Sequence, residues 1–436
     1  MKKRILSLLL VFSIIFILLP IKGFAAPGDV STFKEFKAAL EDPDITLVNI
    51  IAPFTMEKDT ITINPKKSGL VINGNFNQIT QVDSSSAAYS IQFDSAKSNI
   101  QTITIQNLII AGLSRKGFVY IPTCSKYSNF TVNFNKIIYT GPELIKAKYS
   151  NINITDSDIL IQPGHCDSTG YLVEGMNITL SGIVTIDKQA PKSNRSLFYV
   201  NSKGSLVIAN SAIVNIHNNT FDDKVSKKSG FAYFSSCSTK LLFGSNSKFN
   251  YEGVSTFAYG CDIDEVIVGD YAEVIVMISG NLSTCDGLLA VKSLMEVRNS
   301  ATLELIAVNN TNCYPVIEFG NKSVFSVDAP IDILFYNASA KNACYGMAID
   351  NACTMTINYS NVTEVGYWVK NTTPYFALGN PTYAFTSGGN MYSAILGMSC
   401  GKVKTVNTPN YTGSTPLTSA AFKDVNVIHI KGAPET

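Results

Sequence analysis

Few segments of this 436-residue chain combine residue types that could carry out chemistry. Gly164-His165-Cys166-Asp167 places an imidazole beside a thiol, the two groups used together in nucleophilic catalysis. Neighbouring residues rarely reach the geometry of a nucleophile and its base, so a loop is the favoured interpretation. Asp222 and Asp223 form a carboxylate pair, but adjacent residues of a strand point to opposite faces. We therefore predict no catalytic residue in either segment.

Metal binding and acid–base chemistry have equally little support. Asp156 and Asp158 could bind calcium, because the two-residue period of a strand puts both carboxylates on one face. Paired carboxylates at a strand turn are more often simply solvated, so we predict no metal site and no cofactor. His217 and His429 have no evident acid or base partner, and we expect structural roles for both.

The nine cysteines follow a pattern. Cys285 and Cys313 open similar strands 28 residues apart, whereas Cys237 and Cys261 each close a strand. Two interpretations remain open: disulfides between adjacent turns, as Cys237–Cys261 and Cys285–Cys313, or a ladder of free buried thiols. Because nine is odd, at least one thiol must stay free or pair with another chain.

The elements that must position these residues recur in the second half of the chain. Strand–turn–strand phrases such as 206–216 and 266–276 repeat about every 30 residues. Each phrase alternates apolar and polar residues, so one turn can bury its inward face only against the next turn. The expected turn residues are Asn210, Asn246, Asp270, Asn299, Asp328 and Asn358. The period predicts an all-β fold, a parallel β-helix (solenoid), with a sandwich of similar hairpins as the alternative.

The two ends of the chain differ from this repeat. A basic start, an apolar run and Gly23-Phe24-Ala25 are typical of a secretory signal peptide. Thr32 and Glu35 form a capping box that predicts a short helix, which would cover the open end of the solenoid. The predicted segments are a signal peptide (1–25), a capping helix (26–43), a β-helix (44–370) and an irregular C-terminal cap (371–436) that closes with a strand at 425–430.

The net charge of the chain limits the classes of partner that it could bind. The signal peptide holds four basic and no acidic residues, so its removal changes the net charge from +1 to −3. A nearly neutral chain is a poor ligand for nucleic acid or anionic membranes. No later stretch is long and apolar enough to span a bilayer. We expect a secreted or cell-surface protein whose oligomeric state the sequence leaves open.

The order of several phrases resembles the pectate-lyase-like adhesive domain of Gram-positive surface and secreted proteins. The resemblance covers about residues 30–219 and is most specific at Tyr-Thr-Gly-Pro-Glu-Leu, residues 139–144. The other phrases are STFKEFKAAL, ITLVNIIAP, GLVINGNFNQIT, YLVEGMNITLSG and SLFYVNSKGSLVIANSAIVNI. The resemblance implies a right-handed parallel β-helix and an adhesive role, and it transfers no catalytic residues.

The predicted function is that of an exported, non-enzymatic adhesin that binds glycans or host matrix. Pectate lyases of this fold use an arginine base and calcium held by carboxylates, and the segment around Arg115 does not match their arginine motif. A polysaccharide lyase or hydrolase acting on acidic polysaccharide is the alternative. We expect outward tyrosines that could stack on sugars among Tyr259, Tyr314, Tyr345 and Tyr367.

Overall fold

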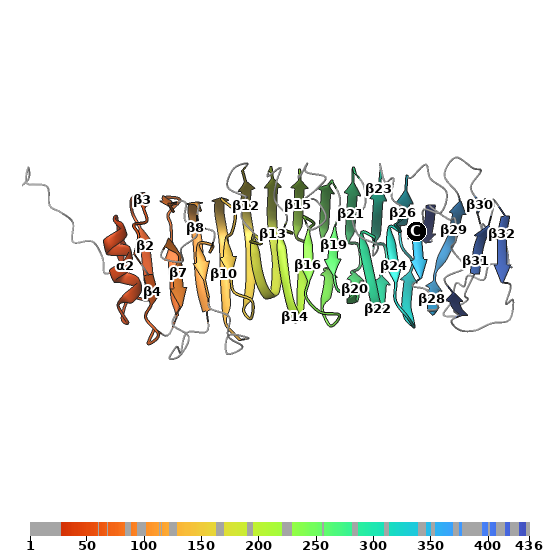
Figure 1. Cartoon of the computed structure of the whole chain (residues 1–436), viewed down its shortest axis with the longest axis horizontal. Coiled ribbons are helices and arrows are strands. Elements are labelled where there is room, and N and C mark those ends of the chain that lie inside the picture. Colours follow the sequence, from red (N-terminus) through yellow and green to blue (C-terminus); the bar gives the residue numbers. More distant parts are fainter. Residues whose placement is uncertain are drawn as a thin grey trace, which may run out of the picture.

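The structure is a computed structural model in which the strands stack into an elongated rod (Figure 1). It describes residues 28–59, 61–67, 69–82, 89–93, 102–112, 114, 116–121, 129–162, 170–189, 195–219, 229–254, 257–280, 287–308, 314–338, 346–349, 354–368, 375–376, 395–399, 402–406, 415–418 and 427–432. Nearly all strand pairs are parallel and join successive turns, so the predicted parallel β-helix is confirmed. The expected signal peptide lies outside the described residues.

Three faces run along the rod, each built of strands that pair with their equivalents in the next turn. Long strands bend over a corner and so contribute to two faces. The first face contains β1 (Asp29–Val30), β2 (Leu47–Ile50), β5 (Leu70–Asn73), β8 (Thr102–Ala111), β10 (Thr131–Thr140), β12 (Asn151–Ile161), the middle of β13 (Val173–Lys188), the last residues of β14 (Phe198–Ile208), β17 (Lys240–Phe243), β20 (Ile263–Val268), the last residues of β22 (Leu289–Val297), β25 (Ser323–Asp328), β28 (Thr354–Ser360) and β33 (Thr415–Thr418).

The second face follows the corner after the first. It takes the C-terminal parts of β8, β10 and β12. Its other strands are β3 (Phe54–Thr55), β6 (Gln78–Thr80), part of β13 (Val173–Lys188), β15 (Ile213–Asn218), β18 (Lys248–Gly253), β21 (Glu273–Ile278), β23 (Thr302–Ala307), β26 (Asp332–Asn337), β34 (Val427–Gly432), β29 (Val362–Trp368) and β30 (Tyr375–Phe376).

The third face carries the candidate site. Its strands are β4 (Ile61–Ile63), β7 (Ile91–Phe93), β9 (Val119–Tyr120), β11 (Ile145–Lys146), the first residues of β13, β14 (Phe198–Ile208) and β22 (Leu289–Val297), and β16 (Ala232–Phe234), β19 (Ala258–Gly260), β24 (Ile317–Phe319) and β27 (Met347–Ile349). A separate hairpin pairs β31 (Ile395–Ser399) with β32 (Lys402–Val406).

The N-terminal end is closed by helix α2 (Phe33–Glu41), as the capping box predicts. Thr32 Oγ1 accepts a hydrogen bond from the Glu35 N–H at 3.2 Å, and Glu35 Oε2 accepts one from the Thr32 N–H at 3.1 Å. Phe36 and Leu40 of this helix are fully buried against the first turns. The helix therefore covers apolar surface and backbone that the first turn would otherwise expose.

The core fills the inside of the rod with side chains that alternate along each strand. Residues such as Ile154, Leu180, Ile208 and Val268 are fully buried, while the residues between them face outward. An aromatic cluster fills the middle of the rod, and Phe231 and Phe257 stack within it at 4.9 Å between ring centres. Apolar burial of this kind stabilises each turn only through its neighbours.

The turns differ from the sequence prediction by one residue. Asn246 has the expected left-handed backbone, with φ of 58°. In the turns at Asn210, Asp270, Asn299 and Asp328, the left-handed residue is instead the next one, namely Ser211, Tyr271, Ser300 and Ala329. Asn210 contributes through its side chain, whose Oδ1 accepts a hydrogen bond from the Ser245 N–H of the next turn at 3.0 Å. Asn358 lies within strand β28 and not in a turn.

The parallel stacking changes at the far end. Strand β34 pairs antiparallel with β26 on one side and with β29 on the other. A closing strand was expected at 425–430, and the observed strand spans Val427–Gly432. Among the described residues, no helix is long and apolar enough to cross a membrane.

Candidate functional site

The structure does not describe several of the residues that the sequence analysis singled out. His165, Cys166, Asp222, Asp223 and Tyr345 are outside the described residues. The same holds for Cys285 and Cys313, so their predicted bridge stays a prediction.

Asp156 has a structural role. It adopts a left-handed backbone, with φ of 47°, at the corner within β12. Its Oδ1 accepts a hydrogen bond from the Ile183 N–H of the next turn at 3.0 Å. Among the residues that the structure describes, no cluster of three or more His, Cys, Asp or Glu side chains could hold a metal ion.

Both histidines have acidic partners, so the expectation that neither would is wrong. His217 Nδ1 lies 3.2 Å from Glu252 Oε2, on adjacent strands of the second face. His429 Nε2 lies 2.5 Å from Asp332 Oδ1, on the antiparallel pair β26–β34. The partners are 35 and 97 residues away in the chain, which is why a local reading of the sequence missed them.

The most distinctive surface is a row of tyrosines on the third face, formed by Tyr171, Tyr199, Tyr233 and Tyr259 and here named the tyrosine row. Strands β13, β14, β16 and β19 follow one another along the middle of the rod (Figure 1). Tyr171 lies just before β13, and the other three tyrosines lie within β14, β16 and β19. Their parallel register places Tyr199 beside Tyr233, and Tyr233 beside Tyr259. Tyr199 and Tyr233 each sit between two inward residues of a short strand, in Phe-Tyr-Val and Ala-Tyr-Phe, so their rings must point outward.

The rings contact one another continuously. The centres of Tyr199 and Tyr233 are 5.4 Å apart with planes 23° apart, which is a stacked arrangement. Tyr259 is turned edge-on to Tyr233, at 4.9 Å and 63°. Tyr171 packs against Tyr199 at 5.1 Å. Such pairs are favourable beyond the area that they bury, so the four rings form one preorganised surface.

Two cations flank one end of the tyrosine row. Lys148 Nζ lies 4.8 Å from the ring centre of Tyr199, and the Arg195 guanidinium lies 5.4 Å from that of Tyr171. Arg195 Nη1 also donates to the Tyr171 hydroxyl at 3.4 Å. Burial raises the pKa of Tyr171, and the neighbouring Arg195 opposes that shift. The three phenols with raised pKa in the row, Tyr171, Tyr233 and Tyr259, stay protonated at neutral pH and can donate hydrogen bonds.

Beneath this basic end lie two buried carboxyl groups. Glu174 is ion-paired with Lys146 at 3.3 Å and is 4 % exposed. Glu143 is 3 % exposed, and burial raises its pKa to about 8, with Glu174 adding to the rise and Lys146 opposing it. Glu143 is therefore protonated at neutral pH, while Glu174 is held by a cation.

The other end of the row opens into a shallow hollow. Tyr259, Gly260, Cys261 and Ala290 line it together with Ala258 and Ile263. Gly260 has a φ of 112°, and a β-carbon there would lie 2.3 Å from the carbonyl oxygen of Phe234. Glycine is thus required at the edge of the hollow, where the backbone of the two turns meets closely.

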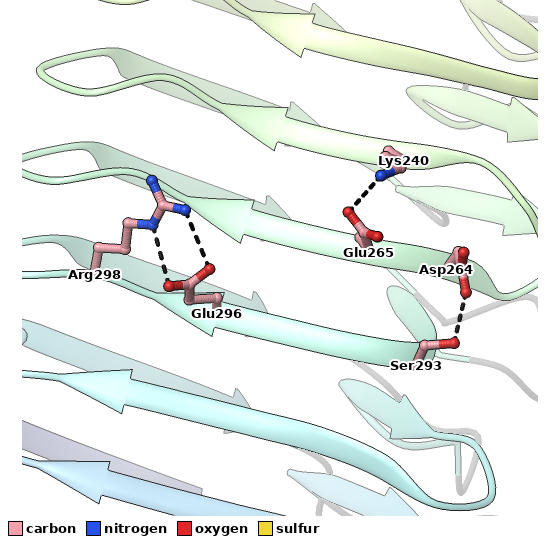
Figure 2. A network of polar contacts seen from close by, with 6 residues as sticks. All are labelled: Lys240, Asp264, Glu265, Ser293, Glu296 and Arg298. Carbon is pink, nitrogen blue, oxygen red and sulfur yellow. Dashed lines mark hydrogen bonds and ion pairs between the residues drawn. The ribbon is translucent and has the colours of Figure 1, made fainter.

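The adjacent first face is charged but internally paired, as Figure 2 shows. Lys240 Nζ contacts Glu265 Oε2 at 2.7 Å, and Ser293 Oγ donates to Asp264 Oδ1 at 2.5 Å. Arg298 forms two contacts with the Glu296 carboxylate, at 3.2 and 3.3 Å. Because these charges satisfy one another, this face offers a weaker binding surface than the tyrosine row.

The two described cysteines lie at the corner between these faces. Cys237 follows β16, Cys261 follows β19, and both are free thiols of intermediate exposure. The Cys261 thiol is in hydrogen-bond contact with Cys237. The structure thus brings together one of the two predicted pairs without a bond between the sulfur atoms.

The sequence prediction found one member of the tyrosine row. Tyr259 belongs to it, whereas Tyr314 packs, partly buried, against the core. Strand β29 includes Tyr367, whose side chain is not described. Tyr171, Tyr199 and Tyr233 were missed. A detectable signal was the tyrosine at the second position of successive short strands, Phe198-Tyr199-Val200 and Ala232-Tyr233-Phe234.

Comparison with known proteins bears on the N-terminal part of the chain. Residues 28–146 match the family described as "Putative pectate lyase-like adhesive domain", which confirms the resemblance seen in the sequence. No curated protein matches this chain. A solved structure titled "L. reuteri 53608 SRRP" is 16% identical with a TM-score of 0.35, and the match covers 69% of this chain and 96% of that one. Identity and TM-score at this level transfer no function.

Proposed function

We propose that this protein is a secreted or surface adhesive protein and that its tyrosine row binds carbohydrate. The observation that carries the proposal is the unbroken contact of four tyrosine rings across successive turns, three of which are half-buried and reach the solvent. The match of residues 28–146 to an adhesive-domain family supports the same role.

The row has the chemistry that a sugar chain requires. The open ring of Tyr259 and the edges of the other rings can pack against the apolar faces of sugar rings, and phenol hydroxyls can hydrogen-bond the sugar hydroxyl groups. Tyr199, Tyr233 and Tyr259 are half-buried, so they are held in place yet still reach the solvent. Tyr199, Tyr233 and Tyr259 lie on three successive strands and so span two strand spacings, about 10 Å. A rigid strip of that length suits an extended ligand, because the protein loses little conformational entropy when the ligand binds.

Catalysis is the second candidate, and one observation favours it. Glu143 and Glu174 are neighbouring carboxyl groups, of which Glu143 has a raised pKa and Glu174 is ion-paired with Lys146, and a hydrolase uses two neighbouring carboxyl groups as an acid and a base. Both are nearly fully buried, at 3 % and 4 % exposure, so a polysaccharide cannot reach them in this conformation. Binding without turnover is therefore the function that the geometry supports better.

A binding assay with matched variants tests the proposal. We would screen the full chain on a glycan array and repeat the screen with Tyr199→Ala and Tyr233→Ala. Tyr271→Ala is the control, because Tyr271 is 51 % exposed at a turn away from the row. The expected result is a loss of at least tenfold in affinity for each row variant and less than twofold for the control. Equal binding by wild type and row variants contradicts the proposal.

The same preparations decide between adhesin and enzyme. Bound glycans would be incubated with the protein and followed by absorbance of unsaturated uronates and by release of reducing ends. We expect no product. Turnover that is lost in Glu143→Gln or Glu174→Gln while the variants remain folded would instead establish an enzyme.

A further inference from the structure

We propose that Cys237 and Cys261 form a modification site, a dithiol that a low-molecular-weight disulfide oxidises to a bridge between two successive turns. The bridge would tie together the strands that carry Tyr233 and Tyr259, and this consequence rests on the proposed function of the tyrosine row.

The backbone brings the two cysteines close together on successive turns. Strands β16 and β19 are parallel partners, with Phe234 opposite Gly260. The Cys261 N–H donates to the Phe234 carbonyl oxygen at 2.9 Å, which fixes Cys261 against the preceding turn. Extended one residue past this pair, the register places Ser235 opposite Cys261, so Cys237 lies two residues further along the preceding turn. The contact between the two thiols shows that the side chains also point toward each other.

The site is accessible to a small reagent. Both cysteines are of intermediate exposure, and Gly260, which precedes Cys261, is exposed. Burial and the contact with Cys237 raise the pKa of the Cys261 thiol, and the neighbouring Asp262 adds to the rise. Lys292 lies beside Cys237, and its Nζ donates a hydrogen bond to the Cys237 carbonyl oxygen at 3.1 Å. The reaction should therefore be slow at neutral pH and faster at mildly alkaline pH.

The chemistry balances as two exchanges. One cysteine thiolate attacks a sulfur atom of the small disulfide and releases one thiolate, which leaves a mixed disulfide. The second cysteine loses its proton to solvent and attacks the protein sulfur of that mixed disulfide. The second small thiolate leaves and takes up a proton. In sum, two cysteine thiols are oxidised to one disulfide while one small disulfide is reduced to two thiols.

The bridge would act directly on the end of the tyrosine row. Cys261 is two residues from Tyr259, and Gly260 between them packs against the ring of Tyr233, so close that an added β-carbon would lie 2.9 Å from it. A covalent tie at this corner would hold Tyr233 and Tyr259 in their edge-on contact. Preorganisation of this kind raises affinity by lowering the entropy lost on binding.

Peptide mapping tests the bond itself. The full chain, purified under reducing conditions, would be treated with oxidised glutathione at pH 8, quenched with an alkylating reagent and cut with trypsin and Asp-N. These proteases separate Cys237 from Cys261 and Cys261 from Cys285, because Lys240, Asp262 and Asp264 lie between them. We expect one linked peptide pair, Cys237–Cys261, that disappears on reduction and is absent from Cys237→Ser and Cys261→Ser.

The outcomes separate the bond from its effect. Mass spectra in which folded wild type shows Cys237 and Cys261 only alkylated, only glutathionylated or bonded to other cysteines would overturn the modification site. The consequence is tested by glycan binding of oxidised and reduced wild type, with Cys237→Ser treated in parallel. We expect at least threefold tighter binding by oxidised wild type and no change for Cys237→Ser. Equal binding by both forms of wild type would overturn the link to the row and leave the disulfide standing.

Discussion

His429 Nε2 lies 2.5 Å from Asp332 Oδ1, and this contact joins two strands that are 97 residues apart in the chain. The two side chains are 18 % and 28 % exposed, so the pair is more shielded from solvent than an ordinary surface ion pair. Strand β34, which carries His429, is the point where antiparallel pairing replaces the parallel stack. The contact therefore helps to hold β34 against β26 on the second face.

The first prediction concerns the contribution of the His429–Asp332 contact to the stability of β34. Asp332→Asn removes the charge but keeps the size, and we expect local opening of β34 to become about fivefold more frequent, which corresponds to about 1 kcal/mol. Hydrogen exchange of residues 427–432, followed by mass spectrometry, measures it. Glu252→Gln is the matched control, because its partner His217 is 44 % exposed and an exposed pair contributes little. Unchanged exchange in Asp332→Asn would show that backbone pairing alone holds β34.

The histidines also show where prediction from sequence stops. Repeats and period-two alternation are local patterns, so the β-helix could be predicted from them. The capping helix could be predicted from the capping box of Thr32 and Glu35. Pairing between Asp332 and His429 depends on how a distant segment returns to the rod, and no local pattern records that. The turns lie between these cases: an Asn or Asp was expected to adopt the left-handed backbone, but at Asn210 the side chain instead caps the next turn and leaves that conformation to Ser211.

The tyrosine row was hidden for a different reason. The repeat length varies, so Tyr199, Tyr233 and Tyr259 are 34 and then 26 residues apart. Only the register of the folded strands brings them side by side. Tyr171 joins the row although it lies just before its strand, a position that strand periodicity does not address. Alternation could predict that these rings face outward, but not that they touch.

The second prediction concerns pH. Glu143 has a pKa near 8 in the folded chain, compared with an ordinary value of 4.5, so folded protein binds this proton more tightly than unfolded protein does. The free energy of unfolding should therefore fall as pH rises from about 4.5 to about 8, by on the order of a few kcal/mol. Glu143→Gln, which mimics the protonated form, should remove most of this fall. Denaturant unfolding at pH 5 and pH 9 measures it, with the exposed Glu57→Gln as control. A variant that keeps the wild-type pH dependence would assign it to other groups.

The third prediction concerns the N-terminal cap. Lys67 is fully buried, and its ammonium donates to the carbonyl oxygen of Ala39 at 3.1 Å and also to those of Asp42 and Ile45. These acceptors include the C-terminal end of helix α2, where a cation is favourable. Lys67→Met leaves the buried carbonyl groups without this donor and should destabilise the cap by about 1–3 kcal/mol. Hydrogen exchange of residues 33–41 should accelerate accordingly. Lys66→Met, one residue earlier and exposed, should change it little.

The last prediction concerns the open end of the tyrosine row. Tyr199 and Tyr233 cover each other's faces because they stack, so a ligand meets mainly their edges and hydroxyls. Tyr259 is turned by 63° and lines the hollow with Ala290, which leaves its ring accessible from that side. Ala290→Tyr would fill the hollow and cover Tyr259, and we expect it to weaken glycan binding at least tenfold while thermal unfolding stays within a few degrees of wild type.

Ala348→Tyr is the matched control for this substitution. Ala348 stands opposite Glu318 further along the third face, and it is half-buried like Ala290. A tyrosine there adds the same aromatic surface away from the hollow, so affinity should stay within twofold of wild type. Stronger binding by Ala290→Tyr would mean that the ligand contacts the outer edge of a longer row, because an added ring would then extend the surface and not block it. Equal binding by all three proteins would place the ligand away from Tyr259.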